Sequence, residues 1–460
     1  MANELRKSGG TFGHRGGPVD VFYLPEGARR HPVVSHGDGV YLWDKDGNRY
    51  IDACSGPVTT NIGHGNKRVI DAMSAQARKI CFAARQHFEN EPNIALAGLV
   101  AELAGPGFER AFFVSGGSEA TEAAIKLARQ YAVARGESSR WKVLGREPGY
   151  HGASLGAASV SGDPASEAIF ASVMQVMPKV PAPFTYRLPE NEDADSYARR
   201  CATALEATIV SEGPDSVLAF IMEPIGGLAT GALVAPDHYY SAVREICDRH
   251  GVLLIYDEVM SGAGRTGAFL AAQHWPDAQP DIVTLAKGIA AGYTPLGMVL
   301  ASAQMVDTVT QSGGFLHGHT YVANPLSCAV GHAVLSEVID RNLMANAAAM
   351  GTHLRARLAE IQETSRILGD VRGRGLLNAI EIVTDRETKR IPPASLLASS
   401  RLTEIGMENG LLLYSRRTAN GKYGEWLMVT PPLIVTEQEI DEIAERLART
   451  LQTFEQEIAG

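Results

Sequence analysis

The feature that most constrains the fold is an alternation of short apolar runs with longer helical stretches between about residues 69 and 300. Strands that are apolar along their whole length are buried on both faces, and helices supply the connections that parallel strands require. The pattern therefore predicts an α/β fold with a parallel or mostly parallel sheet covered on both faces. The expected strands are 111–114, 141–144, 217–222, 252–256, 282–285 and 298–301, and the expected helices include 119–135 and 238–250.

The two flanks of this region have different patterns. Residues 1–30 are rich in Gly and Arg and favour an arm on another surface, and 33–52 read as a small antiparallel meander. From about residue 324, long helices (327–363, broken, and 437–457) surround strands near 376–383, 411–414 and 427–429. We therefore predict three parts: an arm and meander (1–68), a large domain (69–323) and a smaller α+β domain (324–460).

Charge and composition exclude several classes of partner. In 460 residues, 42 Lys and Arg against 52 Asp and Glu give a net charge of −10, without a long basic run, which argues against a nucleic acid or an anionic membrane as partner. The 5 cysteines are scattered, as expected of reduced thiols rather than a disulfide framework or a zinc site. No signal peptide and no 18-residue apolar run are evident, so we expect a soluble, cytoplasmic protein.

The segment from Ser115 to Glu119 follows an expected strand and opens an Ala-rich helix. Its small residues would let a ligand approach the backbone, and the free N–H groups of a first helical turn attract an anion such as phosphate. The alternative is an ordinary connection between strand and helix, with Ser118 as the N-cap.

Two further strand ends carry charged residues. Asp257 and Glu258 follow one buried strand, where a carboxylate could hold a cation, a metal or a protonated ring nitrogen, or could simply cap the next turn. Lys287 follows another strand, where desolvation would lower its pKa and make it an amine nucleophile for Schiff-base chemistry. An ordinary solvated lysine is the alternative.

The fourth segment places Tyr150 and His151 between Gly149 and Gly152, where the aromatic ring could stack on a flat ligand or anchor the loop. Together the four segments call for one ligand, an aromatic phosphorylated aldehyde with a basic ring nitrogen. Pyridoxal 5′-phosphate meets each of these demands.

The motifs as a set resemble those of the class III (omega) aminotransferases, in order from about Gly37 to Glu442. The resemblance implies the type I fold of pyridoxal-phosphate enzymes, with a mostly parallel seven-stranded sheet in the large domain. It also implies a homodimer with active sites at the subunit interface. The stretches that carry it are 113–120, 257–259 with 264–267, 287–288 with 295–297, 318–321 with 324–325, and 431–433.

The resemblance also implies residue roles. Lys287 would attach the cofactor and move the proton, and Asp257 would keep the pyridine nitrogen protonated. The remaining cofactor contacts that the resemblance implies are Gly117 and Ser118 at the phosphate, Tyr150 and Val259 on the two ring faces, Glu223 near the ring hydroxyl, and Thr320 at the phosphate bound by the neighbouring subunit.

Three competing interpretations are weaker. Residues 262–267 satisfy the G-x-G-x-x-G pattern of dinucleotide sites, but no clear helix with an acidic residue about twenty positions on follows. His317 and His319 lack a third ligand at useful spacing, so no metal is expected. A non-enzymatic binding protein is disfavoured because the lysine, the aspartate and the phosphate loop are all present.

The expected reaction is transfer of an amino group from an amine or ω-amino acid to a keto acid, with pyruvate as the expected acceptor. The alternative is a relative with the same cofactor and another outcome: racemase or aminomutase, decarboxylase, or lyase.

Three residues are expected to contact the substrate. Val58 lies in a segment without the aromatic residue that some family members have there, which suggests more room. Tyr414 falls where several ω-aminotransferases have a carboxylate-binding arginine. We therefore expect Arg416, two residues on and on the same strand face, to bind the carboxylate, with Arg417 as second candidate. The alternative is that both arginines are solvated loop residues.

Overall fold

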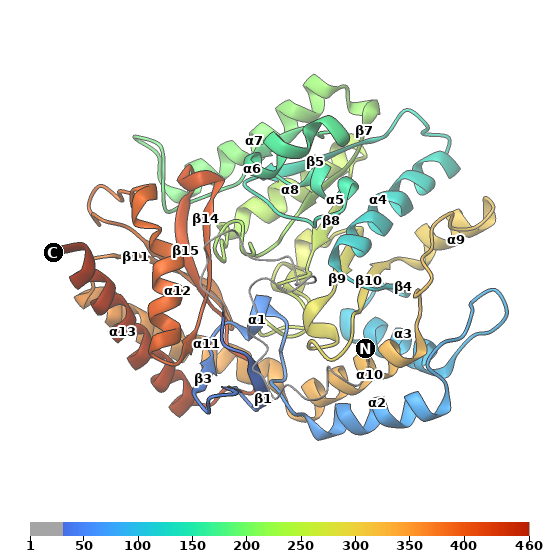
Figure 1. Ribbon diagram of the computed structural model, residues 1–460. Coiled ribbons are helices and arrows are strands. Elements are labelled where there is room, and N and C mark those ends of the chain that lie inside the picture. Colours follow the sequence, from blue (N-terminus) through green and yellow to red (C-terminus); the bar gives the residue numbers. More distant parts are fainter. Residues whose placement is uncertain (1–30, 460) are drawn as a thin grey trace, which may run out of the picture.

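A seven-stranded sheet forms the centre of the molecule, in a computed structural model that describes residues 31–459 (Figure 1). The expected arm, residues 1–30, lies outside the described residues. Five neighbouring strands run parallel, and β10 is antiparallel to both of its neighbours. The predicted α/β fold with a mostly parallel sheet is therefore confirmed. In order across the sheet the strands are β4 (Arg110–Val114), β10 (Gly297–Ala301), β9 (Ile282–Leu285), β8 (Leu253–Asp257), β7 (Val217–Met222), β5 (Lys142–Glu147) and β6 (Lys179–Pro181).

Side chains of the central strands alternate between two hydrophobic clusters, one on each face of the sheet. In β8, Ile255 enters one cluster, and Leu254 and Tyr256 enter the other. The first cluster includes side chains of α4 (Gly117–Ala134), α5 (Leu155–Val160) and α9 (Ala303–Gln311). The second includes side chains of α7 (Ala194–Glu212) and α8 (Asp237–His250). Burial on both faces explains why these strands are apolar throughout.

The parallel strands bring three charged residues to one edge of the sheet. Glu223 follows β7, Asp257 ends β8 and Lys287 comes two residues after β9. The carboxyl ends of parallel strands share an edge, which is where ligands bind in α/β folds.

Two smaller sheets complete the strand structure. In the first, β1 (Val34–Asp38), β2 (Tyr41–Asp44) and β3 (Arg49–Asp52) form the expected meander, and β13 (Leu411–Leu412) adds to it in parallel. The second is antiparallel and has the order β11 (Leu368–Arg374), β12 (Leu377–Ile382), β15 (Gly424–Val429), β14 (Tyr414–Thr418). Figure 1 shows this sheet beside α11 (Leu343–Thr364), α12 (Ala398–Glu408) and α13 (Glu437–Ala459).

The long helix expected over 327–363 is two helices, as the sequence analysis anticipated. α10 (Pro325–Asp340) ends before Asn342, whose φ of 51° breaks the helical path into α11. α10 packs on α2 (Lys67–Lys79) and α3 (Glu91–Ala104), although the predicted limit at residue 323 assigns it to the smaller domain. The domain limits stay predictions. Among residues 31–459, no helix is both long and apolar enough to cross a membrane.

Candidate active site

One cavity of about 610 Å³ at the carboxyl edge of the seven-stranded sheet brings together most of the expected site residues. It is lined by side chains from the large sheet and from β14 of the small antiparallel sheet. The predicted residues that line it are Gly117, Ser118, Tyr150, Glu223, Asp257, Val259, Lys287, Tyr414 and Arg416. Val58 and Thr320 do not line it.

Lys287 enters the cavity from a short turn after β9. Its φ of 49° is rare for a residue with a side chain, so the turn holds the lysine in a defined place at some cost in backbone energy. Burial lowers the pKa of the Lys287 amine to about 8, although Asp257 and Glu223 act in the opposite direction. A larger fraction of the amine is therefore unprotonated at neutral pH than in an exposed lysine, as a nucleophile requires.

Asp257 is buried at the end of β8 and is held from two sides. Its Oδ2 lies 2.8 Å from Nδ1 of the buried His151, and its Oδ1 accepts a 3.0 Å hydrogen bond from the backbone N–H of Val259. The side chain of the neighbouring Glu258 points away from the cavity and accepts hydrogen bonds from the backbone N–H groups of Ala271 and Ala272. Of the two acids singled out in the sequence, Asp257 is thus the one that faces the cavity.

Glu223 is the second buried carboxylate on the cavity wall. Its Oε1 accepts a 2.8 Å hydrogen bond from the backbone N–H of Gly227. Burial raises the pKa of the Glu223 carboxyl, and the negative charge of Asp257 adds to that effect. Glu223 can therefore donate a hydrogen bond into the cavity when it is protonated and accept one when it is ionised.

The first turn of α4 faces the cavity through Gly117 and Ser118. A Cβ on Gly117 would come within 2.9 Å of the Val259 side chain, so this position accepts only glycine without rearrangement. At Gly116 the space beside the backbone is open. The free N–H groups of a helix start, beside a backbone that a ligand can approach, form a site for an anion.

Tyr150 lies on the cavity wall with 42% of its surface exposed. Burial of the remainder raises the pKa of its hydroxyl. The glycine two positions on, Gly152, has a φ of 135°, and a Cβ there would meet Ser118 Oγ at 2.7 Å. The loop that carries Tyr150 therefore lies close against the start of α4.

Tyr414 and Arg416 reach the cavity from the same face of β14. Arg416 donates a 2.7 Å hydrogen bond from Nη2 to Oδ2 of Asp163, across 253 positions of sequence. Arg417 points elsewhere, to the buried Glu425 and the carbonyl of Pro392. Residues 419–423 form the turn of the hairpin that joins β14 to β15.

Val58 is not where the sequence placed it. Its side chain is 1% exposed and belongs to the hydrophobic core, and its neighbours Pro57 and Thr59 line the cavity instead. Ser55, Gly56 and Val58 all have positive φ, so the backbone is kinked over α1 (Ser55–Val58), and the Val58 side chain is buried there. Comparison of this segment with the family pattern gives no sign of these backbone angles.

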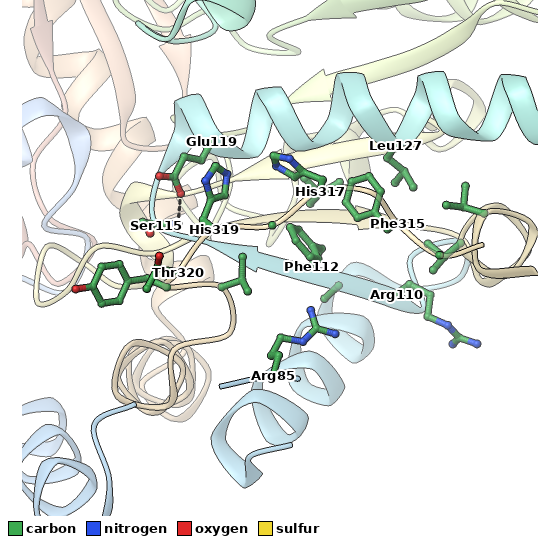
Figure 2. A pocket seen from close by; sticks show the side chains of 18 of the residues that line it. Arg85, Arg110, Phe112, Ser115, Glu119, Leu127, Phe315, His317, His319 and Thr320 are labelled. Atoms are coloured by element: carbon green, nitrogen blue, oxygen red, sulfur yellow. Dashed lines mark hydrogen bonds between the residues drawn. The ribbon is translucent and has the colours of Figure 1, made fainter. Parts of the chain in front are cut away.

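Thr320 is exposed and lines a separate, larger cavity of about 1310 Å³. Figure 2 shows His319 beside Glu119 in the first turn of α4, Thr320 near Ser115, and His317 and Phe315 farther along the helix. Ser115 lines both cavities, so the larger one adjoins the expected phosphate end of the smaller. Burial lowers the pKa of His317 to about 4. Within the described part of the chain, no group of three His, Cys, Asp or Glu side chains is placed to hold a metal ion.

The cavity fits pyridoxal phosphate. It combines an amine with a lowered pKa, a buried carboxylate, a half-exposed aromatic ring and a helix start with open backbone. Lys287, Asp257, Tyr150 and the Gly117–Ser118 turn are suited, in that order, to the aldehyde, ring nitrogen, ring face and phosphate of that cofactor.

Sequence reasoning missed two polar residues of this region. His151 lies directly after Tyr150 in the segment between Gly149 and Gly152, but nothing in the sequence indicated that its ring reaches Asp257. Asp163 has no signal at all, because its partner Arg416 lies on another sheet.

Comparisons with known proteins agree with this geometry. The family model "Aminotransferase class-III" matches residues 23–451. An uncharacterized aminotransferase of Bacillus subtilis is 36% identical over 436 residues, covering 94% of this chain and 98% of that protein. A putrescine–pyruvate aminotransferase of Pseudomonas aeruginosa is 31% identical, covering 91% and 89%. The crystal structure of an omega transaminase from Pseudomonas jessenii in complex with PMP superposes with a TM-score of 0.88 at 31% identity, covering 93% of this chain and 94% of that one.

Proposed function

The chain belongs to the class III aminotransferases and is a pyridoxal-phosphate-dependent transaminase, and from that premise we propose that it moves an amino group from an amine or ω-amino acid to pyruvate. The observation that carries this proposal is the position of Arg416. Among the described residues that line the cavity, it is the only arginine. A guanidinium can form a bidentate pair with the carboxylate of a keto acid, and the relative that uses pyruvate supports this choice of acceptor.

The bound cofactor supplies an electron-withdrawing ring that stabilises negative charge at the substrate carbon. The chain's own residues do the rest. The turn after β9 holds the Lys287 amine at a defined place in the cavity. From there the unprotonated amine can take a proton from the substrate carbon and pass it to a second atom nearby. Asp257, kept in place by His151 and the Val259 N–H, supplies the negative charge that favours a protonated ring nitrogen.

We also propose that Gly117, Ser118, Tyr150, Glu223 and Val259 contact the cofactor, and that two chains form a dimer in which Thr320 reaches the partner's phosphate. Support for the dimer comes from apolar side chains that are exposed in residues 82–88 and in residues 316–321, the segment that contains Thr320. These are Phe82 (41%), Phe88 (67%), Leu316 (83%) and Tyr321 (61%). Apolar surface of this kind is expected where another chain binds. The cytoplasmic location predicted from the sequence stays a prediction.

The reaction can be tested by the visible absorbance of the holoenzyme. An amine or ω-amino acid added without a keto acid should remove the yellow absorbance band, and pyruvate should restore it. If no donor in a panel of amines, diamines and ω-amino acids changes the band, the proposed donor class is wrong. If 2-oxoglutarate restores the band and pyruvate does not, the proposed acceptor is wrong.

The role of Arg416 can be tested in the same assay. Arg416→Ala should lower kcat/KM for pyruvate by about 10²-fold, the scale of a lost charged hydrogen-bond pair. Arg135→Ala is the matched control, because Arg135 is exposed at the far end of α4. A helix of this length places it roughly 27 Å from the cavity end of α4.

A further inference from the structure

Asp163 connects the two walls of the active-site cavity. It lies just before α6 (Pro164–Phe170), on the side of the large sheet, and its Oδ2 accepts the hydrogen bond from Arg416 of β14. An aspartate in this N-cap place normally accepts a hydrogen bond from its own helix. Here the side chain makes no capping bond, so its hydrogen bond goes to Arg416 instead.

The pair is partly shielded from water. The Asp163 and Arg416 side chains are 14% and 27% exposed, and Oδ1 of Asp163 is buried without a hydrogen-bond partner. A buried carboxylate oxygen without a partner is costly, so an apolar or uncharged residue would be easier to accommodate here if packing were the only requirement. The ion pair with the Arg416 guanidinium offsets the cost of burying the Asp163 carboxylate.

Arg416 remains able to bind a second carboxylate. Among residues 31–459, the bond from Nη2 to Asp163 is the one hydrogen bond that the guanidinium makes, and a guanidinium has five N–H donors. The side chain also lines the cavity, next to Tyr150 and Tyr414. One donor thus holds the group, and no other residue of the described part of the chain takes up the remaining donors, which can face the substrate.

We infer that Asp163 is a positioning residue, which holds the Arg416 guanidinium against the large sheet so that its free N–H donors meet the substrate carboxylate. This inference rests on the proposed function. A long arginine on an edge strand has many rotamers, and its order is lost unless something fixes its end. Asp163 belongs to the same part of the molecule as Lys287 and Asp257, so it fixes the carboxylate site relative to the reacting groups.

Binding of propionate, which resembles pyruvate without the keto oxygen, tests the inference without turnover. We expect calorimetric titration of the holoenzyme to show that Asp163→Ala weakens propionate binding by about tenfold, the scale of one charged hydrogen bond. Asp163→Asn keeps an oxygen that can accept the Arg416 bond, so it should recover affinity to within about threefold of the wild type. Propionamide, the uncharged analogue, should bind all three proteins alike.

The matched control is Asp215→Ala, which removes the same charge from an exposed aspartate just before β7, at the opposite end of that strand from Glu223. It should bind propionate as the wild type does. Tighter propionate binding by both Asp163 variants would overturn the inference, because it would make Asp163 a competitor of the substrate. Weaker binding of propionate and propionamide alike would also overturn it, because that pattern is a general loss of structure.

A double variant separates this inference from the proposed function. In the Arg416→Ala background, Asp163→Ala should have no further effect on propionate affinity, since the group that it positions is gone. If Arg416→Ala weakens binding and Asp163→Ala does not, the inference fails and the proposed carboxylate site stands. If Arg416→Ala itself binds propionate normally, the proposed carboxylate site fails.

Discussion

The two walls of the active-site cavity are built differently. On the large-sheet wall, Asp257 is buried and bonded to both His151 and a backbone N–H, and Lys287 sits on a turn with an unusual backbone angle. On the β14 wall, Arg416 is partly exposed, and within residues 31–459 its one ion pair is with Asp163.

This difference separates chemistry from recognition. Groups that must keep their protonation state and position are held beside the large sheet, Asp257 by two hydrogen bonds and Lys287 on a turn of defined backbone geometry. The group expected to recognise the substrate lies on a separate sheet, at the edge, with donors to spare. A substitution on β14 can therefore change the choice of substrate, whereas one at the strand ends of the large sheet affects every substrate.

The comparison can be broken most directly at Lys287. Lys287→Ala should abolish turnover with every donor, because Lys287 is the one lysine among the described residues that line the cavity. The purified variant should also lose its yellow colour on dialysis. Turnover within tenfold of the wild type would show that Lys287 is not the reacting amine.

Asp257→Asn should have the next largest effect. The change preserves size but removes the negative charge that favours a protonated ring nitrogen, so we expect kcat to fall by about 10³-fold while the cofactor stays bound. Stopped-flow absorbance and cofactor content measure the two properties separately. A normal rate would show that the ring nitrogen does not need this charge.

His151 provides a finer test of the large-sheet wall, because it contributes there through its contact with Asp257. His151→Leu should lower kcat by about tenfold, with loss of the bond to Oδ2, and should alter the pH dependence of the visible band. His151→Asn places an amide N–H near the position of Nδ1 and should recover most of the rate. Equal losses in both variants would point to packing rather than to the hydrogen bond.

The smallest expected effect is a shift along the pH axis. Burial disfavours the charged form of Lys287 and lowers its pKa to about 8. The amine therefore becomes unprotonated, and reactive, at a lower pH than the amine of an exposed lysine. The rate at which apoenzyme takes up pyridoxal phosphate should rise by about tenfold per pH unit below pH 8 and level off above it. A rate that keeps rising to pH 10 would mean an ordinary lysine.

The sequence was most informative where polar residues interrupt buried strands. Asp257 and Lys287 stand at the ends of apolar runs, and a parallel sheet brings such ends together, so periodicity predicted their neighbourhood, while the resemblance supplied their roles. The short edge strand β6 was not foreseen, because it has three residues and ends in Pro181, which lacks the N–H of a regular strand.

Contacts between distant segments were beyond the sequence. Arg416 was expected to face the substrate because it shares a strand face with Tyr414, and it does line the cavity. Its tie to Asp163 depends on how two sheets pack, which no local pattern encodes. Val58 was misplaced because positive φ angles at residues other than glycine are set by the surrounding fold.

The separation of chemistry from recognition is tested most directly by measuring the two half-reactions of Asp257→Asn and Arg416→Ala under single-turnover conditions. Asp257→Asn should slow the donor and pyruvate half-reactions by the same factor. Arg416→Ala should slow the pyruvate half-reaction by about 10²-fold and change the deamination of an amine without a carboxylate by less than about threefold. Equal losses in both half-reactions of Arg416→Ala would contradict the account, because β14 would then serve the chemistry as well.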